Sequence, residues 1–265
     1  MCGIAGYSVR SRSTVDRTLA AQALLAAIAE RGADAVGYAY RAPADTYSTV
    51  VKQRTPASQL LDRVAVPHEA NQLLVHVRDY TKGHPSIAAN NHPVRHGPVV
   101  GIHNGIIVND DDLLDRLDCA RSEPSMTVDS EAIFAVAAHS LNDARALEEL
   151  RGAMATAWLD EREPGVLYLA RGSGRPLWIG EGRECVFFGS TRLALEIVEH
   201  YCGVKLRKKA AREGTWFQVA DGEVLRRERF RHDRDYVETD PLPPVRAPHE
   251  REFCLSRLES IAAAA

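Results

Sequence analysis

The chain has 265 residues, of which 45% are hydrophobic and 26% are charged, and its formal net charge is -3 at pH 7. This length is enough for one large domain or two small ones. Such a weakly acidic chain has no bulk attraction to nucleic acid or to an anionic membrane surface. The sequence also contains no apolar run long enough to span a membrane and no secretion signal, so we expect a cytoplasmic protein.

Cysteine and histidine spacing gives no indication of a metal site. The chain has 5 cysteines, an odd number with no CxxC pair, which argues against zinc ribbons and disulfide frameworks. Histidines cluster between residues 76 and 103, but no HExxH or HxH spacing is present. Neither a GxGxxG sequence nor a P-loop occurs, so we expect no metal, no nucleotide and no other cofactor.

The first half of the chain alternates predicted strands and helices. In chain order we expect a strand at 3–9, a helix at 14–30, strands at 37–42 and 47–52, a short helix at 58–64 and a buried strand at 73–77. An apolar run follows at 98–107. Three acidic residues at 110–112 suit the first turn of a helix, and an apolar helix is predicted at 131–141.

The second half is richer in strands. We expect strands at 155–159, 166–170, 177–179 and 185–189, a helix at 193–201, and a hairpin of 216–219 with 224–229 across Asp221-Gly222. The basic run 205–209 is interpreted as a solvated face. The order of strands, helices and strands again predicts an α+β protein with large, mainly antiparallel sheets covered by helices, rather than a βαβ repeat.

The composition changes near residue 233. We predict one domain over residues 1–232, followed by a C-terminal segment, 233–265, that comprises an Asp- and Pro-rich linker and a short helix at 250–264. This segment either docks a partner or packs on the domain.

Cys2 is the strongest candidate for a catalytic residue because only Met1 precedes it. If Met1 is removed, Cys2 carries both a nucleophilic thiol and a free α-amine, whose unperturbed pKa is near ~8. A single residue then supplies the nucleophile and the base, as in enzymes with N-terminal nucleophiles. The alternative is a small buried cysteine that happens to be second in the chain.

Three further positions carry candidate chemistry, each with a structural alternative. Asn104-Gly105 interrupts the apolar run and can form an oxyanion hole, although locally an Asn-Gly turn between two strands explains it better. Arg78 follows a buried strand and can clamp a carboxylate, or it can cap the strand or pair with Asp79. Asp129 precedes a helix, where it can hold an ammonium group or act as a simple cap.

Taken in order, five segments resemble the class II glutamine amidotransferases, the N-terminal-nucleophile hydrolases that release ammonia from glutamine. These segments are residues 1–6, 30–37, 76–78, 103–107 and 128–131, and the likeness extends over roughly residues 2–230. The chain is most similar to the glutaminase domain of glucosamine-6-phosphate synthase. The resemblance implies a four-layer α/β/β/α sandwich with two antiparallel sheets.

The resemblance also implies roles for individual residues. Cys2 matches the nucleophile, and Asn104 with Gly105 matches the oxyanion-hole pair. The α-carboxylate of glutamine is expected at Arg78 and its α-amino group at Asp129. We include three further residues in the predicted substrate site: Thr81 of the loop after Arg78, Arg31 at the end of the first helix, and His103.

Two departures from the family leave alternatives open. Asp79 and Lys82 occupy loop positions where the family has Trp and His, and the sugar-isomerase domain of the synthase has no counterpart here. We therefore expect a glutaminase that passes ammonia to a separate acceptor protein, with no nucleic-acid or membrane partner and with a homo-oligomer left open. The alternatives are an amidase for another γ-glutamyl amide and a weakly catalytic regulatory relative.

Overall fold

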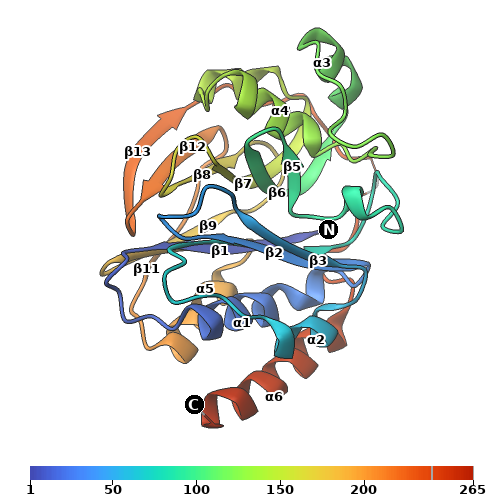
Figure 1. Cartoon of the computed structure of the whole chain (residues 1–265). Helices are drawn as coiled ribbons and strands as arrows, with labels where there is room; N and C mark the ends of the chain where they lie inside the picture. Colours follow the sequence, from blue (N-terminus) through green and yellow to red (C-terminus); the bar gives the residue numbers. More distant parts are fainter. Residues whose placement is uncertain (240, 265) are drawn as a thin grey trace.

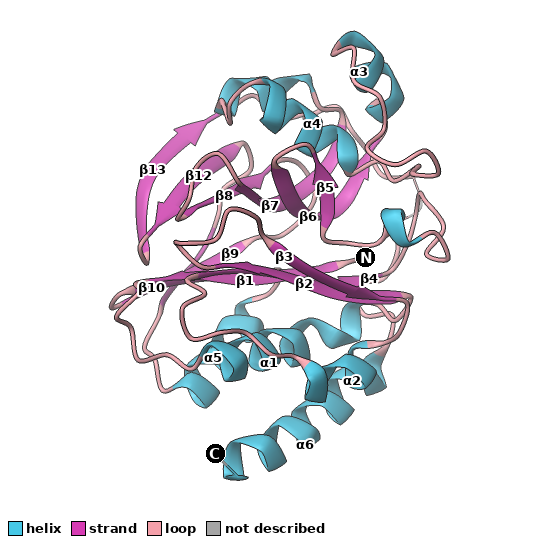
Figure 2. Ribbon diagram, viewed as in Figure 1, coloured by secondary structure: helices cyan, strands magenta, loops and turns pink. Residues whose placement is uncertain are grey.

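The computed structural model describes residues 1–239 and 241–264, so Asp240 and Ala265 of the predicted C-terminal segment lie outside the described residues. Two antiparallel β-sheets lie face to face, and each carries helices on its outer side (Figure 1). The arrangement has four layers in the order helix, sheet, sheet, helix (Figure 2). The α+β class and the four-layer sandwich predicted from the sequence are therefore confirmed.

The first sheet has seven strands, of which β1 lies in the middle. In spatial order they are β11 (Arg207–Ala210), β9 (Trp178–Gly182), β10 (Cys185–Gly189), β1 (Gly3–Val9), β4 (Gln72–Arg78), β2 (Ala35–Arg41) and β3 (Thr49–Gln53). The second sheet has six strands: β13 (Glu223–Arg229), β12 (Thr215–Ala220), β8 (Val166–Arg171), β7 (Gly152–Asp160), β6 (Val99–Ile107) and β5 (Val94–His96).

The helices divide between the two outer layers. The first sheet is covered by α1 (Arg17–Ile28), α2 (Ala57–Leu60) and α5 (Arg192–Cys202), and the second by α3 (Asp110–Arg116) and α4 (Glu131–His139) (Figure 1). The last helix, α6 (Pro248–Ala264), packs on the outer side of α1 and α2 (Figure 1). Short 3-10 helices occur at Ala29–Arg31, Leu61–Arg63, Ala88–Asn90 and Ala144–Glu149. No helix within residues 1–239 and 241–264 is long and apolar enough to cross a membrane.

Alternation along the strands explains why the molecule has three apolar layers. On β1, Ala5, Tyr7 and Val9 pack toward the α1 layer, whereas Ile4 packs between the sheets. On β7, Trp158 packs toward the α4 layer while neighbouring residues face the other sheet. Because successive strand residues point to opposite faces, each buried strand serves two cores. Each fully buried large apolar side chain contributes roughly 1.5–3 kcal/mol.

Local sequence determines where elements begin and turn. The first helix starts at Arg17 rather than at the predicted Thr14, because the Asp16 side chain caps it by accepting a hydrogen bond from the Leu19 amide at 2.9 Å. The predicted hairpin turn is confirmed, with positive φ values of 49° at Asp221 and 74° at Gly222. These angles suit the tight two-residue turn that joins twisted strands.

Two expectations are wrong in detail. The run 98–107 is not broken at Asn104-Gly105, because β6 pairs with β7 along its full length and places Asn104 opposite Ala155. The local turn interpretation of this pair therefore fails. The basic run 205–209 is not simply a solvated face, because its second half forms the edge strand β11 against β9.

The C-terminal segment runs back from β13 to the α1 layer. The backbone amides of Arg246 and Ala247 donate to the Glu30 carbonyl at 2.9 and 2.8 Å. The following helix, α6, buries Cys254 and Leu258 completely against the α1 core. This path brings residues near 246 beside the beginning of the chain.

Candidate active site

A small cavity lies where β1, β4 and β6 converge with the loop that follows β4. Of the predicted residues, Cys2, Arg78, Thr81, His103, Gly105 and Asp129 line it. Its volume is about 10 Å³, close to the space of one water molecule. The structure thus brings these side chains together, but the cavity is too small for an amino acid unless the loop 79–83 moves.

Cys2 immediately precedes the central strand β1 and lies beside that loop. Its thiol donates a hydrogen bond to the Asp79 backbone carbonyl at 3.4 Å. Burial raises the pKa of the Cys2 thiol, which favours the protonated form. The Arg31 Nε atom donates to the Cys2 carbonyl at 2.9 Å. Arg31 does not line the cavity, and its guanidinium instead fixes the backbone of the candidate nucleophile.

Arg78 ends β4 with its side chain almost fully buried. The guanidinium donates to Asn91 Oδ1 at 2.6 Å, to the Lys82 carbonyl at 2.9 Å and to the Gly83 carbonyl. Two of these acceptors belong to the loop 79–83. Both loop bonds come from Nη2, so a carboxylate that binds this atom replaces the loop carbonyls, which links carboxylate binding to loop opening.

Asp129 lies just before α4 and is 3% exposed. One carboxylate oxygen accepts a hydrogen bond from the Ile107 amide at 2.7 Å. Burial, with a smaller contribution from nearby Asp110, raises the pKa of Asp129 to about 6, although the Ile107 amide and Lys82 oppose the shift. The carboxylate has no cationic partner within ion-pair distance in the described part of the chain. It is therefore suited to receive a cation from outside.

Gly105 lines the cavity, whereas Asn104, the residue before it on β6, does not. Gly105 has a φ of 151°, and an added Cβ would lie 1.9 Å from the Ala153 carbonyl oxygen, so only glycine fits there. Asn104 is fully buried between the sheets, and neither its amide nitrogen nor its oxygen has a hydrogen-bond partner within the described residues. An unpaired buried amide is costly and suggests a group that is completed by a ligand.

Three buried histidines beside the cavity are neutral. Burial lowers the pKa of His76 and of His103 to about 3, and it lowers that of His92 well below the usual range. The His103 Nε2 atom lies 3.3 Å from the Ala153 carbonyl, so its proton is placed there, and Nδ1 lies 2.9 Å from Ser130 Oγ. His103 thus orders the wall of the cavity without carrying charge.

The loop 79–83 is held closed by charged contacts from distant parts of the chain. The Asp79 carboxylate pairs with the Met1 ammonium group and with Arg246 Nε at 3.3 Å. The Lys82 ammonium group pairs with Asp110 at 2.7 Å. The C-terminal segment and the start of α3 therefore both hold this loop.

Sequence analysis did not identify Asn91, which orients Arg78, or Arg246, which reaches Asp79. The polar run Asn90-Asn91-His92 before a strand was a usable indication for Asn91. Nothing local marks Arg246, which lies 167 residues from its partner. No cluster of three or more metal-ligating side chains occurs where the structure is described.

Residues 76–196 match the family of glutamine amidotransferase domains. Over 209 residues the chain is 35% identical to the glutamine–fructose-6-phosphate aminotransferase (isomerizing) of Salmonella typhi. It is 33% identical over 205 residues to the enzyme of the same name from Escherichia coli K12. Each match covers 74% of this chain and 32% of the relative, so the chain spans about a third of their length.

Two solved structures share the fold. The glutamine phosphoribosylpyrophosphate amidotransferase of B. subtilis aligns with 86% of this chain and 49% of its own, at a TM-score of 0.65 and 18% identity. A glutamine aminotransferase class-II domain protein from Silicibacter pomeroyi aligns with 86% of this chain and 99% of its own, at a TM-score of 0.56 and 19% identity. The sequence matches assign the chain to the class II glutamine amidotransferases, and the structural likenesses show the N-terminal-nucleophile hydrolase fold.

Proposed function

We propose that this chain hydrolyses L-glutamine to glutamate and ammonia, with Cys2 as the nucleophile. The observation that carries the proposal is the cavity that joins the Cys2 thiol to Arg78, Asp129 and Gly105. A nucleophile, a cation, an anion and a backbone amide are the groups that attack on the amide of a zwitterionic amino acid requires. The sequence matches to glutamine-dependent enzymes support the same conclusion.

Substrate binding uses the two opposite charges. Arg78 receives the α-carboxylate of glutamine once the loop carbonyls of Lys82 and Gly83 withdraw. Asp129 receives the α-ammonium group, whose positive charge stabilises the ionised carboxylate against the effect of burial. When the α-carboxylate and the α-ammonium group of glutamine are both bound, its side-chain amide lies near Cys2, which lowers the entropic cost of attack.

The chemical steps follow from the same geometry. After removal of Met1, the α-amine of Cys2 takes the thiol proton, and the sulfur attacks the amide carbon of glutamine. The resulting oxyanion is bound by the Asn104 side-chain amide and the Gly105 N–H, and the protonated α-amine gives its proton to the departing ammonia. Water then cleaves the γ-glutamyl thioester, which releases glutamate and restores the thiol.

The experiment combines mass spectrometry with product detection. The intact mass establishes whether Met1 has been removed, and ammonia and glutamate are measured with L-glutamine as substrate. We expect release by the processed protein and none by Cys2→Ala, whereas Cys119→Ala, a partly buried cysteine outside the cavity, keeps wild-type activity. Absence of release from processed protein, with the loop free to open, contradicts the proposal.

Substrate class is tested in the same assay. Glutamine, asparagine and γ-glutamyl amides are compared side by side, and we expect the highest kcat/KM for glutamine. Preference for another γ-glutamyl amide favours the amidase alternative. Glutamine binding without turnover favours a regulatory relative, for which the Asp79 and Lys82 contacts that close the loop provide a structural reason.

We further propose that a separate acceptor protein uses the ammonia. The described residues form a single glutaminase-like unit around the cavity at Cys2. The test compares glutamine hydrolysis with and without candidate synthetases from the same organism. A partner that raises the rate and incorporates glutamine nitrogen into product supports the proposal, and incorporation from free ammonia alone contradicts it.

A further inference from the structure

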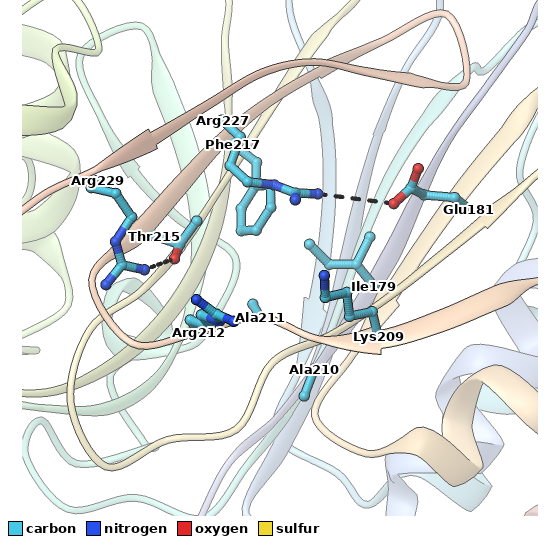
Figure 3. A pocket seen from close by; sticks show the side chains of 10 residues that line it. All are labelled: Ile179, Glu181, Lys209, Ala210, Ala211, Arg212, Thr215, Phe217, Arg227 and Arg229. Atoms are coloured by element: carbon cyan, nitrogen blue, oxygen red, sulfur yellow. Dashed lines mark hydrogen bonds and ion pairs between the residues drawn. The ribbon is translucent and has the colours of Figure 1, made fainter.

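A second, larger cavity opens between the two sheets at the end where β11 and β13 form their edges. It has a volume of about 390 Å³ and is shown in Figure 3. Its floor is apolar and includes the buried side chains of Ile179 and Phe217. None of its lining residues belongs to the cavity at Cys2. In the sheet, β11 lies three strands from β1, a separation of roughly 14 Å at the usual spacing.

Charged residues occupy positions that a sandwich normally fills with apolar side chains. Lys209 lies opposite Ile179, and Arg227 lies opposite Phe217, in the strand registers. Directly opposed residues point to the same face of a sheet, so both cations face the space between the sheets. Arg229, opposite Thr215, does the same, and Figure 3 shows these side chains converging on the cavity.

The cations around the cavity outnumber the carboxylates. Lys209, Arg212, Arg227 and Arg229 line it together with one carboxylate, Glu181. Glu181 is shared, since it pairs with Arg207 at 2.8 Å and reaches Arg227 only at 4.0 Å. Over the described ranges, no ion pair involves Lys209, Arg212 or Arg229. Like charges that face each other across a gap repel, and a bound anion relieves that repulsion.

Two of the guanidinium groups are already oriented. Arg227 lies over the Phe217 ring at 5.1 Å from its centroid, and Arg229 donates to the Thr215 hydroxyl. An ordered guanidinium fork loses less freedom when it binds a phosphate or a carboxylate through two hydrogen bonds. The apolar floor beside it offers contact to the organic part of a ligand.

We propose that this cavity binds a small organic phosphate, such as a sugar phosphate or a nucleotide, at a site separate from Cys2. The volume falls within the range of small-molecule pockets. Lys209 and the arginines hold the phosphate, and Ile179 and Phe217 contact the organic portion. The small volume of the cavity and the overall net charge of -3 favour a small molecule over a nucleic acid. This proposal does not depend on the glutaminase activity.

The test is isothermal titration calorimetry of the full chain with four probes: inorganic phosphate, glucose 6-phosphate, AMP and glucose. We expect saturable binding of at least one of the two organic phosphates, weaker binding of inorganic phosphate and no binding of glucose. Comparison of the Kd for glucose 6-phosphate with the Kd for AMP shows whether the cavity prefers a sugar or a nucleoside as the organic portion. Absence of saturable binding for both organic phosphates overturns the proposal.

A pair of charge-matched variants shows where the probe binds. Lys209→Gln combined with Arg227→Gln removes two cations from the cavity, and we expect Kd to rise by at least about tenfold. Lys205→Gln combined with Arg226→Gln removes the same charge from exposed positions outside the lining, and we expect Kd within about twofold of wild type. Equal weakening in both variants means bulk attraction and refutes the site. Circular dichroism checks that each variant is folded. If the double variant unfolds, the titration is repeated with Lys209→Gln alone.

Discussion

Replacing Asp129 by asparagine is expected to stabilise the protein at neutral pH while it weakens glutamine binding. Asparagine has nearly the same shape, and its oxygen still accepts the hydrogen bond that the Ile107 amide makes at 2.7 Å. What changes is the buried negative charge, which has no cationic partner among the described residues. The variant therefore separates the cost of holding this charge from the benefit of its hydrogen bond.

The magnitude follows from the pKa of Asp129, which burial raises from 3.8 to about 6. A carboxyl group that binds protons more tightly when folded loses stability as the pH rises from the unfolded pKa to the folded one. The shift of roughly two units corresponds to about 3 kcal/mol of destabilisation above the folded pKa and to about half of that near pH 5. Asp129→Asn should recover much of this free energy at neutral pH and less at acidic pH.

The assay is urea denaturation at about pH 7.5 and about pH 5, with kcat/KM for glutamine measured in parallel. Loss of one partner of a charged contact costs about 2–5 kcal/mol, so kcat/KM should fall by at least about 30-fold. Asp111→Asn is the control, since its pairing with Arg121 lowers the pKa of Asp111 and the variant should lose stability at neutral pH. An Asp129→Asn protein that is less stable than wild type at pH 7.5 refutes the desolvation argument.

Three further predictions concern the surroundings of Cys2. Gly105→Ala places a Cβ 1.9 Å from the Ala153 carbonyl oxygen, so denaturant titration should show a loss of about 2 kcal/mol or more, together with loss of ammonia release. Arg31→Met removes the donor to the Cys2 carbonyl. Steady-state kinetics should then show a lower kcat with little change in KM, and a selective rise in KM would assign Arg31 to substrate binding instead. After removal of Met1, Arg246 is the remaining cation on Asp79, and Arg246→Gln removes it. The acidic limb of the pH–rate profile should then move to higher pH, because the negative charge of Asp79 raises the pKa of the Cys2 thiol. Stability should change by less than about 1 kcal/mol, since this ion pair is partly exposed, and an unchanged profile would mean that Arg246 has no influence on Cys2.

The spacing of apolar residues along the chain was enough to predict most strands and helices of the sandwich. Strands such as β1 and β4 carry continuous apolar runs because both of their faces are buried, and caps such as Asp16 mark helix ends within a few residues. The edge strand β11 was missed because its exposed residues are Arg207 and Lys209, where a core strand carries apolar residues. An edge strand with charged side chains has no hydrophobic pattern to detect.

The candidate site was predictable only in part, for a related reason. The opening residues and the segments around Arg78 and Asp129 were identified by their resemblance to a family, and they meet in one cavity. Local pattern alone favoured a turn at Asn104-Gly105. The strand is possible there because Gly105 adopts a φ that other residues avoid and because β7 pairs along the whole of β6. Pairing between distant strands is not encoded in local spacing.

The closed loop suggests how ligand binding and access to Cys2 are coupled. Arg78 is satisfied by the carbonyls of Lys82 and Gly83 when no carboxylate is bound, so closure protects a buried cation that would otherwise be unpaired. A bound carboxylate takes over this role and releases those carbonyls, at little net cost in hydrogen bonds. Ion pairs also hold the loop closed: Asp79 pairs with Met1 and with Arg246 of the C-terminal segment, and Lys82 pairs with Asp110 of α3. Removal of Met1 takes away one of them. Processing of the chain and access to the cavity are therefore linked through the same carboxylate, that of Asp79.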